Sequence, residues 1–369
     1  MTVPLFDLRR QNAELADAFR AQFDQLLDTA QFVLGPAVEA LEQALAQRAG
    51  AAHAVGLSSG TDALLTALMA LNVRPGDEVV TTPFTWISTA NVISRVGATP
   101  VFVDIDADTY NIDPARIAAA ITPRTRAIIP VHLFGLPADM DAIMRIAGEH
   151  GDIPIIEDAA QSIDACVGER VVGSIGNVGC LSFYPTKNLA AMGDAGACVT
   201  NDAALADKLR SLRVHGQVGA RDFPHIGGNF RIDALQAAML SVKLLFLDQW
   251  TQARQTIARR YSEAFANLPV VCPHKTDGVR HVYNQYTIRV LDDRRDALLN
   301  HLTDRKIGHR VYYPAPLHLQ TCFAGLGCED GSFPESERAA REVVSLPIFP
   351  ELTPQEQNQV IEVMCEFFR

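Results

Sequence analysis

Short strand-like runs alternate with helical patterns from His53 to about Asn201, and no other feature of the chain constrains its fold as strongly. The strand-like runs lie at 54–57, 78–80, 100–103, 127–131 and 153–156, and the helical patterns at 61–72, 86–96, 113–121 and 139–150. Such alternation is typical of βαβ units, which build a mostly parallel sheet with helices on both faces. An apolar run at 197–200 follows the turn-like stretch 193–196, and we expect it to return antiparallel. The chain is therefore predicted to be an α/β protein.

The flanking regions predict a large first domain and a smaller second one. Apolar residues at helical spacing indicate helices before residue 50, including one at 11–30, and a long helix from Asp233 to about Asn267 with Trp250 as a candidate interruption. The smaller α+β unit is indicated by a strand at 285–290, a helix at 294–305, a strand at 309–312 and a terminal helix from about Pro354. We predict domains at 1–248 and 249–369. The segment 215–230 is rich in glycine and too long for an ordinary connection, which favours a functional loop.

The composition restricts the classes of function. The 369 residues carry a formal net charge of −11 and no Lys/Arg cluster, which argues against a general binder of nucleic acid or of membrane surfaces. Seven cysteines form no C-x-x-C pair and lie mostly in apolar segments, which indicates reduced thiols in the cytosol. No stretch approaches the roughly 18 uninterrupted apolar residues of a membrane span, and the polar N-terminus has no signal-like apolar region. We expect a soluble, cytoplasmic protein.

One acidic run resembles a metal site and fails the detailed comparison. The residues from Asp104 to Asp108 match the opening of a calcium loop, but Thr109 stands where that loop requires glycine and Ala115 where it requires glutamate. The histidines are scattered without metal-ligand spacing. We therefore predict no metal site.

A lysine and an acid follow two of the apolar runs. Lys187 lies in SFYPTKNL (182–189), and Asp158 lies in EDAAQ (157–161), directly after an apolar run. Ligands of open parallel sheets sit at the carboxyl ends of the strands, and Gln161 shares a face with Asp158 if the turn begins a helical bend. A surface lysine and a solvated loop acid are the plain alternatives. However, a lysine is rarely placed between two apolar strands for solubility.

The stretch SSGTD (58–62) follows a strand and opens a helix. Its N–H groups and the helix dipole could hold a phosphate, with the Thr61 hydroxyl as a further donor, although an ordinary N-cap explains the same residues. This cradle occurs together with a flat aromatic residue (Trp86), an acid at a strand tip and a positioned lysine. The combination suits pyridoxal 5′-phosphate. Lys187 would form the Schiff base, Asp158 would keep the pyridine nitrogen protonated, and the amides would hold the phosphate.

Four ordered motifs resemble the DegT/DnrJ/EryC1/StrS family of sugar aminotransferases. They are SGTDAL (59–64), EDAAQ (157–161), SFYPTKNL (182–189) and GNFRIDALQAA (228–238), and the resemblance extends from PLFDL (4–8) to SLPI (345–348). It implies a pyridoxal phosphate-dependent transferase of fold type I, with a mostly parallel seven-stranded sheet in a large domain and a small α+β domain. It also implies a homodimer whose active sites lie at the subunit interface.

The motif match further implies residue roles. Lys187 would be the internal-aldimine lysine and the proton shuttle between C4′ and the sugar carbon. Asp158 would pair with the pyridine nitrogen, Gln161 would approach the ring hydroxyl, and Trp86 would stack on the ring. The phosphate contacts would come from Gly60, Thr61 and Ser182, with Asn229 from the neighbouring subunit.

Substrate contacts are less well marked in the sequence. The family's usual His-Tyr-Pro before Pro-Leu-His is Tyr-Tyr-Pro at 312–314 here, so sugar contacts inferred for that loop do not carry over directly. Tyr313 and His318 are weak substrate-site candidates, and Arg231 either faces the sugar nucleotide or braces its loop.

The resemblance also implies a reaction. Glutamate, the usual donor of the family, would load its amino group as pyridoxamine 5′-phosphate, and a nucleotide-linked keto-sugar would accept it. The run RIDALQAA (231–238) with VKL (242–244) favours amination at C3. Amination at C4, a cyclitol ketone acceptor and a non-catalytic regulatory protein remain alternatives. A dehydratase is disfavoured, because the dehydratases that resemble the family replace the lysine that is present here as Lys187.

Overall fold

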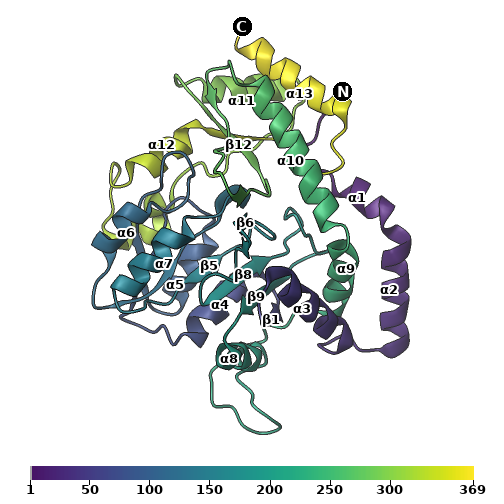
Figure 1. Cartoon of the computed structure of the whole chain (residues 1–369), viewed down its shortest axis with the longest axis vertical. Helices are drawn as coiled ribbons and strands as arrows, with labels where there is room; N and C mark the ends of the chain where they lie inside the picture. Colours follow the sequence, from purple (N-terminus) through teal and green to yellow (C-terminus); the bar gives the residue numbers. More distant parts are fainter. Residues whose placement is uncertain (1) are drawn as a thin grey trace.

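A seven-stranded sheet occupies the centre of the larger part of the molecule in the computed structural model, which describes residues 2–369 (Figure 1). A four-stranded ladder, β1-β9-β8-β5, meets a three-stranded ladder, β3-β2-β4, through parallel bridges from Ile128 to Ile155 and from Val131 to Asp158. The strands are β1 (His53–Leu57), β2 (Glu78–Thr81), β3 (Thr99–Phe102), β4 (Thr125–Ile129), β5 (Ile156–Asp158), β8 (Val178–Ser182) and β9 (Gly196–Thr200). Only β9 runs antiparallel to its neighbours within this sheet of the described chain. The predicted α/β class and the antiparallel return at 197–200 are confirmed.

Helices cover both faces of this sheet. Successive side chains of a strand point to opposite faces, and neighbouring residues accordingly pack in different apolar clusters. Leu181 and Val199 lie in a cluster with α2, α3 and α9, whereas Cys180 and Cys198 lie in one with α4, α5 and α8. The helices of this part are α1 (Leu8–Glu14), α2 (Ala16–Thr29), α3 (Pro36–Ala49), α4 (Gly60–Ala70), α5 (Ser88–Arg95), α6 (Pro114–Ala120), α7 (Met140–Glu149), α8 (Ala203–Arg213) and α9 (Ala234–Leu244).

A second sheet and the last helices form a smaller unit, at the top of Figure 1. The strands β10 (Val270–Val271), β12 (Tyr286–Val290) and β13 (Val343–Leu346) pair antiparallel in that order. Its helices are α10 (Leu247–Ala264), α11 (Arg295–Asp304), α12 (Pro334–Glu342) and α13 (Pro354–Phe367), and 3₁₀ turns lie at η1 (Leu133–Gly135), η2 (Leu317–Leu319) and η3 (Thr321–Leu326). A capping box starts α13, because Thr353 and Glu356 each accept the other's backbone N–H.

Contacts across residue 248 join the two units, and two of them involve the smaller unit's core and a strand pair. Val3 packs in the apolar core of the smaller unit. In the other direction, β11 (Val279–Arg280) pairs with β6 (Cys166–Val167), which also pairs with β7 (Arg170–Val171). The division into domains at 1–248 and 249–369 stays a prediction.

Three local expectations differ from the structure. The helix expected from Asp233 to Asn267 is broken at residues 245–246, earlier than Trp250, with neither proline nor glycine at the break. Phe246 begins the next helix: its carbonyl accepts the Trp250 N–H and its ring stacks on Trp250. The helix expected at 11–30 is broken at Leu15 into α1 and α2. The strand expected at 309–312 is wrong, because that segment forms only one bridge, from Arg310 to Ser345.

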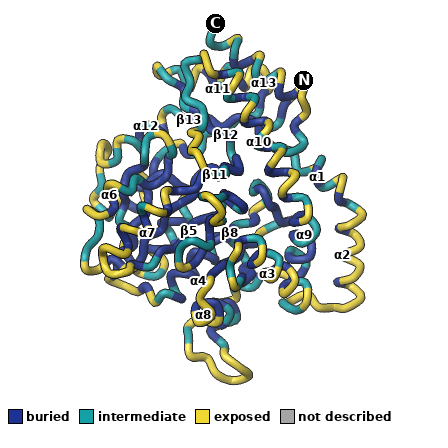
Figure 2. Tube along the Cα trace, in the orientation of Figure 1, coloured by how far each residue is buried: buried dark blue, intermediate teal, exposed yellow. Residues whose placement is uncertain are grey.

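Exposed apolar side chains gather on two segments. The loop at 215–230 projects from the body, at the bottom of Figures 1 and 2, and carries the exposed Val218, Phe223 and Ile226. The other segment includes α2 and the turn after it, and its exposed side chains are Phe23, Leu27, Phe32 and Val33. Within residues 2–369, no helix combines the length and the apolar character needed to cross a membrane.

Candidate active site

The sheet brings the predicted lysine, acid and phosphate cradle to one edge. Asp158 ends β5, Lys187 follows β8, and α4 begins directly after β1. Because β5 and β8 are parallel neighbours, their carboxyl ends lie together. Close backbone contacts fix the third element: a Cβ on Gly196 would come within 2.4 Å of the Ser59 backbone, so only glycine fits at the start of β9. The three motifs identified in the sequence therefore meet at one place.

Asp158 is held in a defined orientation. Its side chain is 5% exposed, and its two oxygens accept from the Thr89 hydroxyl at 2.8 Å and the Ala160 N–H at 3.2 Å. Burial raises the pKa of the Asp158 carboxyl, while the Thr89 hydrogen bond and the charge of Lys187 oppose that shift. A cationic partner would therefore stabilise the charged carboxylate at this position.

Lys187 carries a free amine beside this acid. Its backbone N–H closes a turn onto the Tyr184 carbonyl at 2.8 Å, whereas its half-buried amine has no hydrogen-bond or ion-pair partner among residues 2–369. Burial lowers the pKa of Lys187 to about 8, and the charge of Asp158 only partly opposes that shift. About a tenth of the amine is consequently neutral, and nucleophilic, at pH 7.

Gln161 lies in a hydrogen-bonded row with an aromatic wall. Its carbonyl oxygen accepts the Phe134 N–H at 2.6 Å, and its amide nitrogen donates to the Tyr313 hydroxyl at 3.0 Å. The ring of Trp86 lies 6.2 Å from that of Tyr313, centroid to centroid, and Trp86 is 59% exposed. The predicted Gln161, Trp86 and Tyr313 are therefore brought together, and more than half of Trp86 is exposed.

The start of α4 has the character of an anion cradle. Ser59 caps the helix by accepting the Asp62 N–H at 3.0 Å, and the Thr61 hydroxyl lies 2.9 Å from that of Ser88. The N–H groups of Gly60 and Thr61 have no partner among residues 2–369. A Cβ on Gly60 would fall 2.6 Å from the Ser182 Cβ, so glycine keeps the cradle open beside the hydroxyl of Ser182. Free helix N–H groups with two hydroxyls beside them suit a phosphate.

The donor set fits pyridoxal phosphate. The cradle provides for a phosphate, Asp158 for a protonated ring nitrogen, and the free amine of Lys187 for a carbonyl carbon. The exposed aromatic side chain of Trp86 suits a flat ring.

Sequence reasoning missed the groups that support Asp158 from behind. Thr89 lies on α5, and its position three residues after Trp86 is the only signal that would have indicated it. His132 and Glu157 form a fully buried pair at 2.9 Å. Because His132 Nδ1 accepts the Ala138 N–H, its Nε2 donates to Glu157. Glu157 also accepts backbone N–H groups from Gly173, Ile175 and Gly176, which fixes the strand end that carries Asp158.

Three predicted residues lie apart from this cluster. Asn229 is exposed, and it lines a pocket of about 400 Å³ together with Arg231 and Ser58. His318 is 2% exposed and bonded to Glu337 at 3.0 Å. Within residues 2–369, none of the three forms a hydrogen bond, an ion pair or a ring pair with the predicted residues around Lys187. A buried histidine paired with a glutamate has the features of a structural residue.

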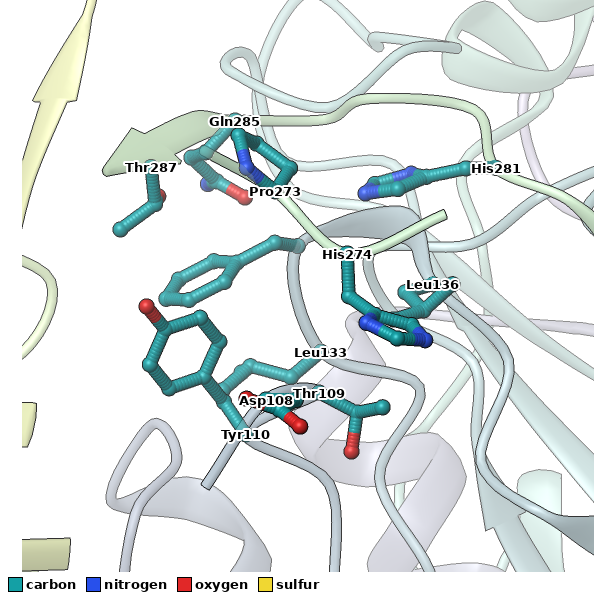
Figure 3. Close-up of a pocket in the computed structure, with 11 residues that line it drawn as sticks. Asp108, Thr109, Tyr110, Leu133, Leu136, Pro273, His274, His281, Gln285 and Thr287 are labelled. Atoms are coloured by element: carbon teal, nitrogen blue, oxygen red, sulfur yellow. The ribbon is translucent and has the colours of Figure 1, made fainter. Parts of the chain in front are cut away.

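A smaller hollow lies where the loop around η1 meets the start of β12 (Figure 3). Tyr110 and Thr287 lie at one end and His274 and His281 at the other. His281 accepts the Tyr283 N–H and stacks on that ring, and burial lowers the pKa of His281 to about 3. This histidine is therefore neutral, and we assign no chemistry to the hollow.

Comparisons with known proteins identify the family of this chain. The sequence profile of the DegT/DnrJ/EryC1/StrS aminotransferase family matches residues 13–365. A protein of Geobacillus stearothermophilus named pleiotropic regulatory protein is 48% identical, over 100% of this chain and 99% of that one. A UDP-N-acetyl-3-dehydro-alpha-D-glucosamine 3-aminotransferase of Acidithiobacillus ferrooxidans is 44% identical, over 98% and 97%.

A solved structure extends the agreement to the backbone. The crystal structure of DesV from S. venezuelae in complex with a ketimine intermediate has a TM-score of 0.97 and 41% identity, and the match covers 100% of this chain and 99% of that one. The whole fold therefore has a solved counterpart. The chain belongs to the DegT/DnrJ/EryC1/StrS aminotransferase family and is a pyridoxal 5′-phosphate-dependent sugar aminotransferase.

Proposed function

We propose that the protein transfers the amino group of glutamate to the C3 keto group of a nucleotide-linked sugar. The observation that carries this proposal is the free amine of Lys187, whose pKa is lowered to about 8 beside the buried Asp158. Amination at C3 is supported by the 44% identical relative from A. ferrooxidans, whose name specifies a 3-aminotransferase.

Two side chains would handle the proton and charge movements. Pyridoxal phosphate supplies a carbonyl that takes up the amino group and a ring that accepts the electron pair of the broken C–H bond. Lys187 Nζ moves the proton between C4′ of the cofactor and the substrate carbon, for which it must be neutral part of the time. Asp158 keeps the ring nitrogen protonated, and Thr89 orients its carboxylate.

The remaining residues would position the cofactor. Gly60, Thr61 and Ser182 hold the phosphate at the start of α4. The exposed Trp86 stacks on the pyridine ring of the cofactor. The Gln161 carbonyl oxygen is already bound by Phe134. Its amide nitrogen donates one hydrogen to Tyr313, so its second hydrogen is the one left to donate to the ring hydroxyl.

We further propose a homodimer with shared active sites. Asn229 and Arg231 would reach the partner's phosphate and nucleotide, since both line an open pocket and neither forms a hydrogen bond or an ion pair with the predicted residues around Lys187 among residues 2–369 of its own chain. The exposed apolar side chains on α2 and on the loop at 215–230 supply a surface that association would bury. A cytoplasmic location is supported by the seven cysteines, which are all free.

A two-step experiment tests the reaction. Adding glutamate to the loaded enzyme should remove its visible cofactor band and release 2-oxoglutarate. A panel of 3-keto and 4-keto nucleotide sugars should then restore the band, and NMR of the product locates the new amine. An amine at C4, or restoration by a cyclitol ketone alone, would replace the C3 assignment.

The name of the Geobacillus relative favours a second candidate, a regulatory protein that binds the cofactor without turnover. The same spectra separate the two functions. A cofactor band that no amino acid removes would support the regulatory function over the aminotransferase.

A further inference from the structure

Buried polar atoms without partners gather beside the lysine loop. Within residues 2–369, the unpartnered buried atoms include Arg254 Nε, Gln285 Oε1 and both side-chain heteroatoms of Asn284, and these three residues line one pocket with Thr186. Arg254 and Asn284 are 7% and 5% exposed. An unsatisfied buried polar group costs about 1–3 kcal/mol, so several in one place indicate a site that a polar ligand or water completes.

Arg254 presents one free side of its guanidinium group. Nη1 donates to the carbonyls of Ile348 at 2.9 Å and Tyr283 at 3.2 Å, which hold the side chain in place. Nε has no partner, and no bond is made by Nη2 within residues 2–369. No carboxylate of the described chain lies within 4 Å, although Glu351 attracts the charge from further away. The Nε–Nη2 side is the one that grips a carboxylate with two parallel hydrogen bonds.

These groups line a small pocket that adjoins the proposed active site. Its walls include Arg254, Asn284, Thr186 and Tyr312, together with the 43% exposed Phe6. Thr186 precedes Lys187, and Tyr312 precedes Tyr313. In each of these two sequence pairs, one residue therefore lines the pocket and the other belongs to the cofactor cluster.

We propose that this pocket binds a carboxylate group of the amino-acid donor, gripped by Arg254 and by the amide of Asn284. The inference rests on the proposed aminotransferase function and assigns the donor's recognition to residues of this chain. Arg254 supplies a fixed positive charge and a planar donor pair, and Asn284 supplies a donor N–H without a competing protein partner. Glutamate, the donor of the proposed function, presents two carboxylates to such a site.

The test uses two variants and a matched control. Arg254→Lys keeps the charge and loses the paired donors, whereas Asn284→Ala removes a side chain whose atoms make no bond and so leaves folding intact. Arg289→Lys is the control, because Arg289 is a partly buried arginine that already binds Glu342 and the Ala107 carbonyl. The dissociation constant for glutamate is measured from loss of the visible cofactor band in the loaded enzyme. We expect it to rise about 10- to 100-fold in Arg254→Lys and about 5- to 10-fold in Asn284→Ala. Arg289→Lys should leave it unchanged.

Calorimetry on the cofactor-free protein provides a second readout. Succinate should bind the wild type and Arg289→Lys, and should bind Arg254→Lys at least about tenfold more weakly. Inorganic phosphate should not displace it. Displacement by phosphate at equal concentration would assign the pocket to a free anion and overturn the donor assignment.

The two proposals fail in different ways. If wild-type enzyme never loses its cofactor band with any amino acid, the aminotransferase function fails. If the wild type reacts but Arg254→Lys and Asn284→Ala keep its dissociation constant for glutamate, the function stands and the carboxylate pocket is overturned.

Discussion

Two lysines of this molecule share a lowered pKa and differ in everything else. Burial lowers the pKa of both Lys187 and Lys243 to about 8. Lys187 lies at a sheet edge, with Asp158 near it and a free, half-buried amine. Lys243 is 1% exposed on α9 and lies over the ring of Phe19 at 5.7 Å. A perturbed lysine therefore does not identify an active site, and the acid, the cradle and the open space around it do.

The largest difference is expected in turnover. Lys187→Ala should lower the rate of both half-reactions by about 10³-fold or more, because it removes the group that moves the proton. Lys243→Met should keep the wild-type rate. Stopped-flow spectroscopy with glutamate measures both variants. Full activity in Lys187→Ala would end the assignment of that lysine.

Replacing the acid beside Lys187 should have the next largest effect. Asp158→Asn keeps the shape and the Thr89 contact but loses the charge, so we expect about a 10²-fold lower rate of the first half-reaction. Binding of the phosphate should persist, since the cradle is untouched. A rate within twofold of wild type would show that Asp158 does not protonate the ring nitrogen.

For the free energy of unfolding, in contrast to turnover, Lys243 is the lysine whose replacement should matter. A lysine whose folded pKa lies below its unfolded value of 10.5 destabilises the protein fully below pH 8, and this penalty is lost as the pH rises towards 10.5. Lys243→Met should therefore be more stable than wild type by about 1–3 kcal/mol at pH 7, and by little near pH 10. Urea unfolding at the two pH values measures the difference. A destabilised Lys243→Met at pH 7 would show that Lys243 makes a favourable buried contact.

The smallest expected effect is a pH dependence at Lys187. Only the neutral amine attacks a carbonyl, so incorporation of pyridoxal phosphate into the cofactor-free protein should accelerate about tenfold between pH 7 and pH 9. The rate should level off above the pKa of about 8. Borohydride reduction followed by peptide mass mapping should place the label on Lys187 and none on Lys243. A midpoint near pH 10 would mean that burial does not lower the pKa.

The sequence predicts the motif residues well because their signals are local. Asp158 and Lys187 each follow an apolar strand, and parallel strands bring their ends together. Thr89 and the pair His132–Glu157 could not be predicted, since their contacts join segments that no periodicity relates. The break before α10 also differs from the predicted position, because neither proline nor glycine marks it in the sequence.

The pocket at Arg254 could not be predicted from the sequence for the same reason. Arg254 reads in the sequence as one polar position of a long helix. Its unpaired Nε becomes visible only when the carbonyls of Tyr283 and Ile348 are seen to occupy its other side.

The loop at 215–230 projects away from the body of its own chain. In the proposed assembly, a substitution at Asn229 would damage the site of the other copy and spare its own. A cell carrying one allele altered at Lys187 and another altered at Asn229 would then form mixed dimers with one intact site. The two inactive alleles would therefore complement each other, and a cell that carries both would keep activity.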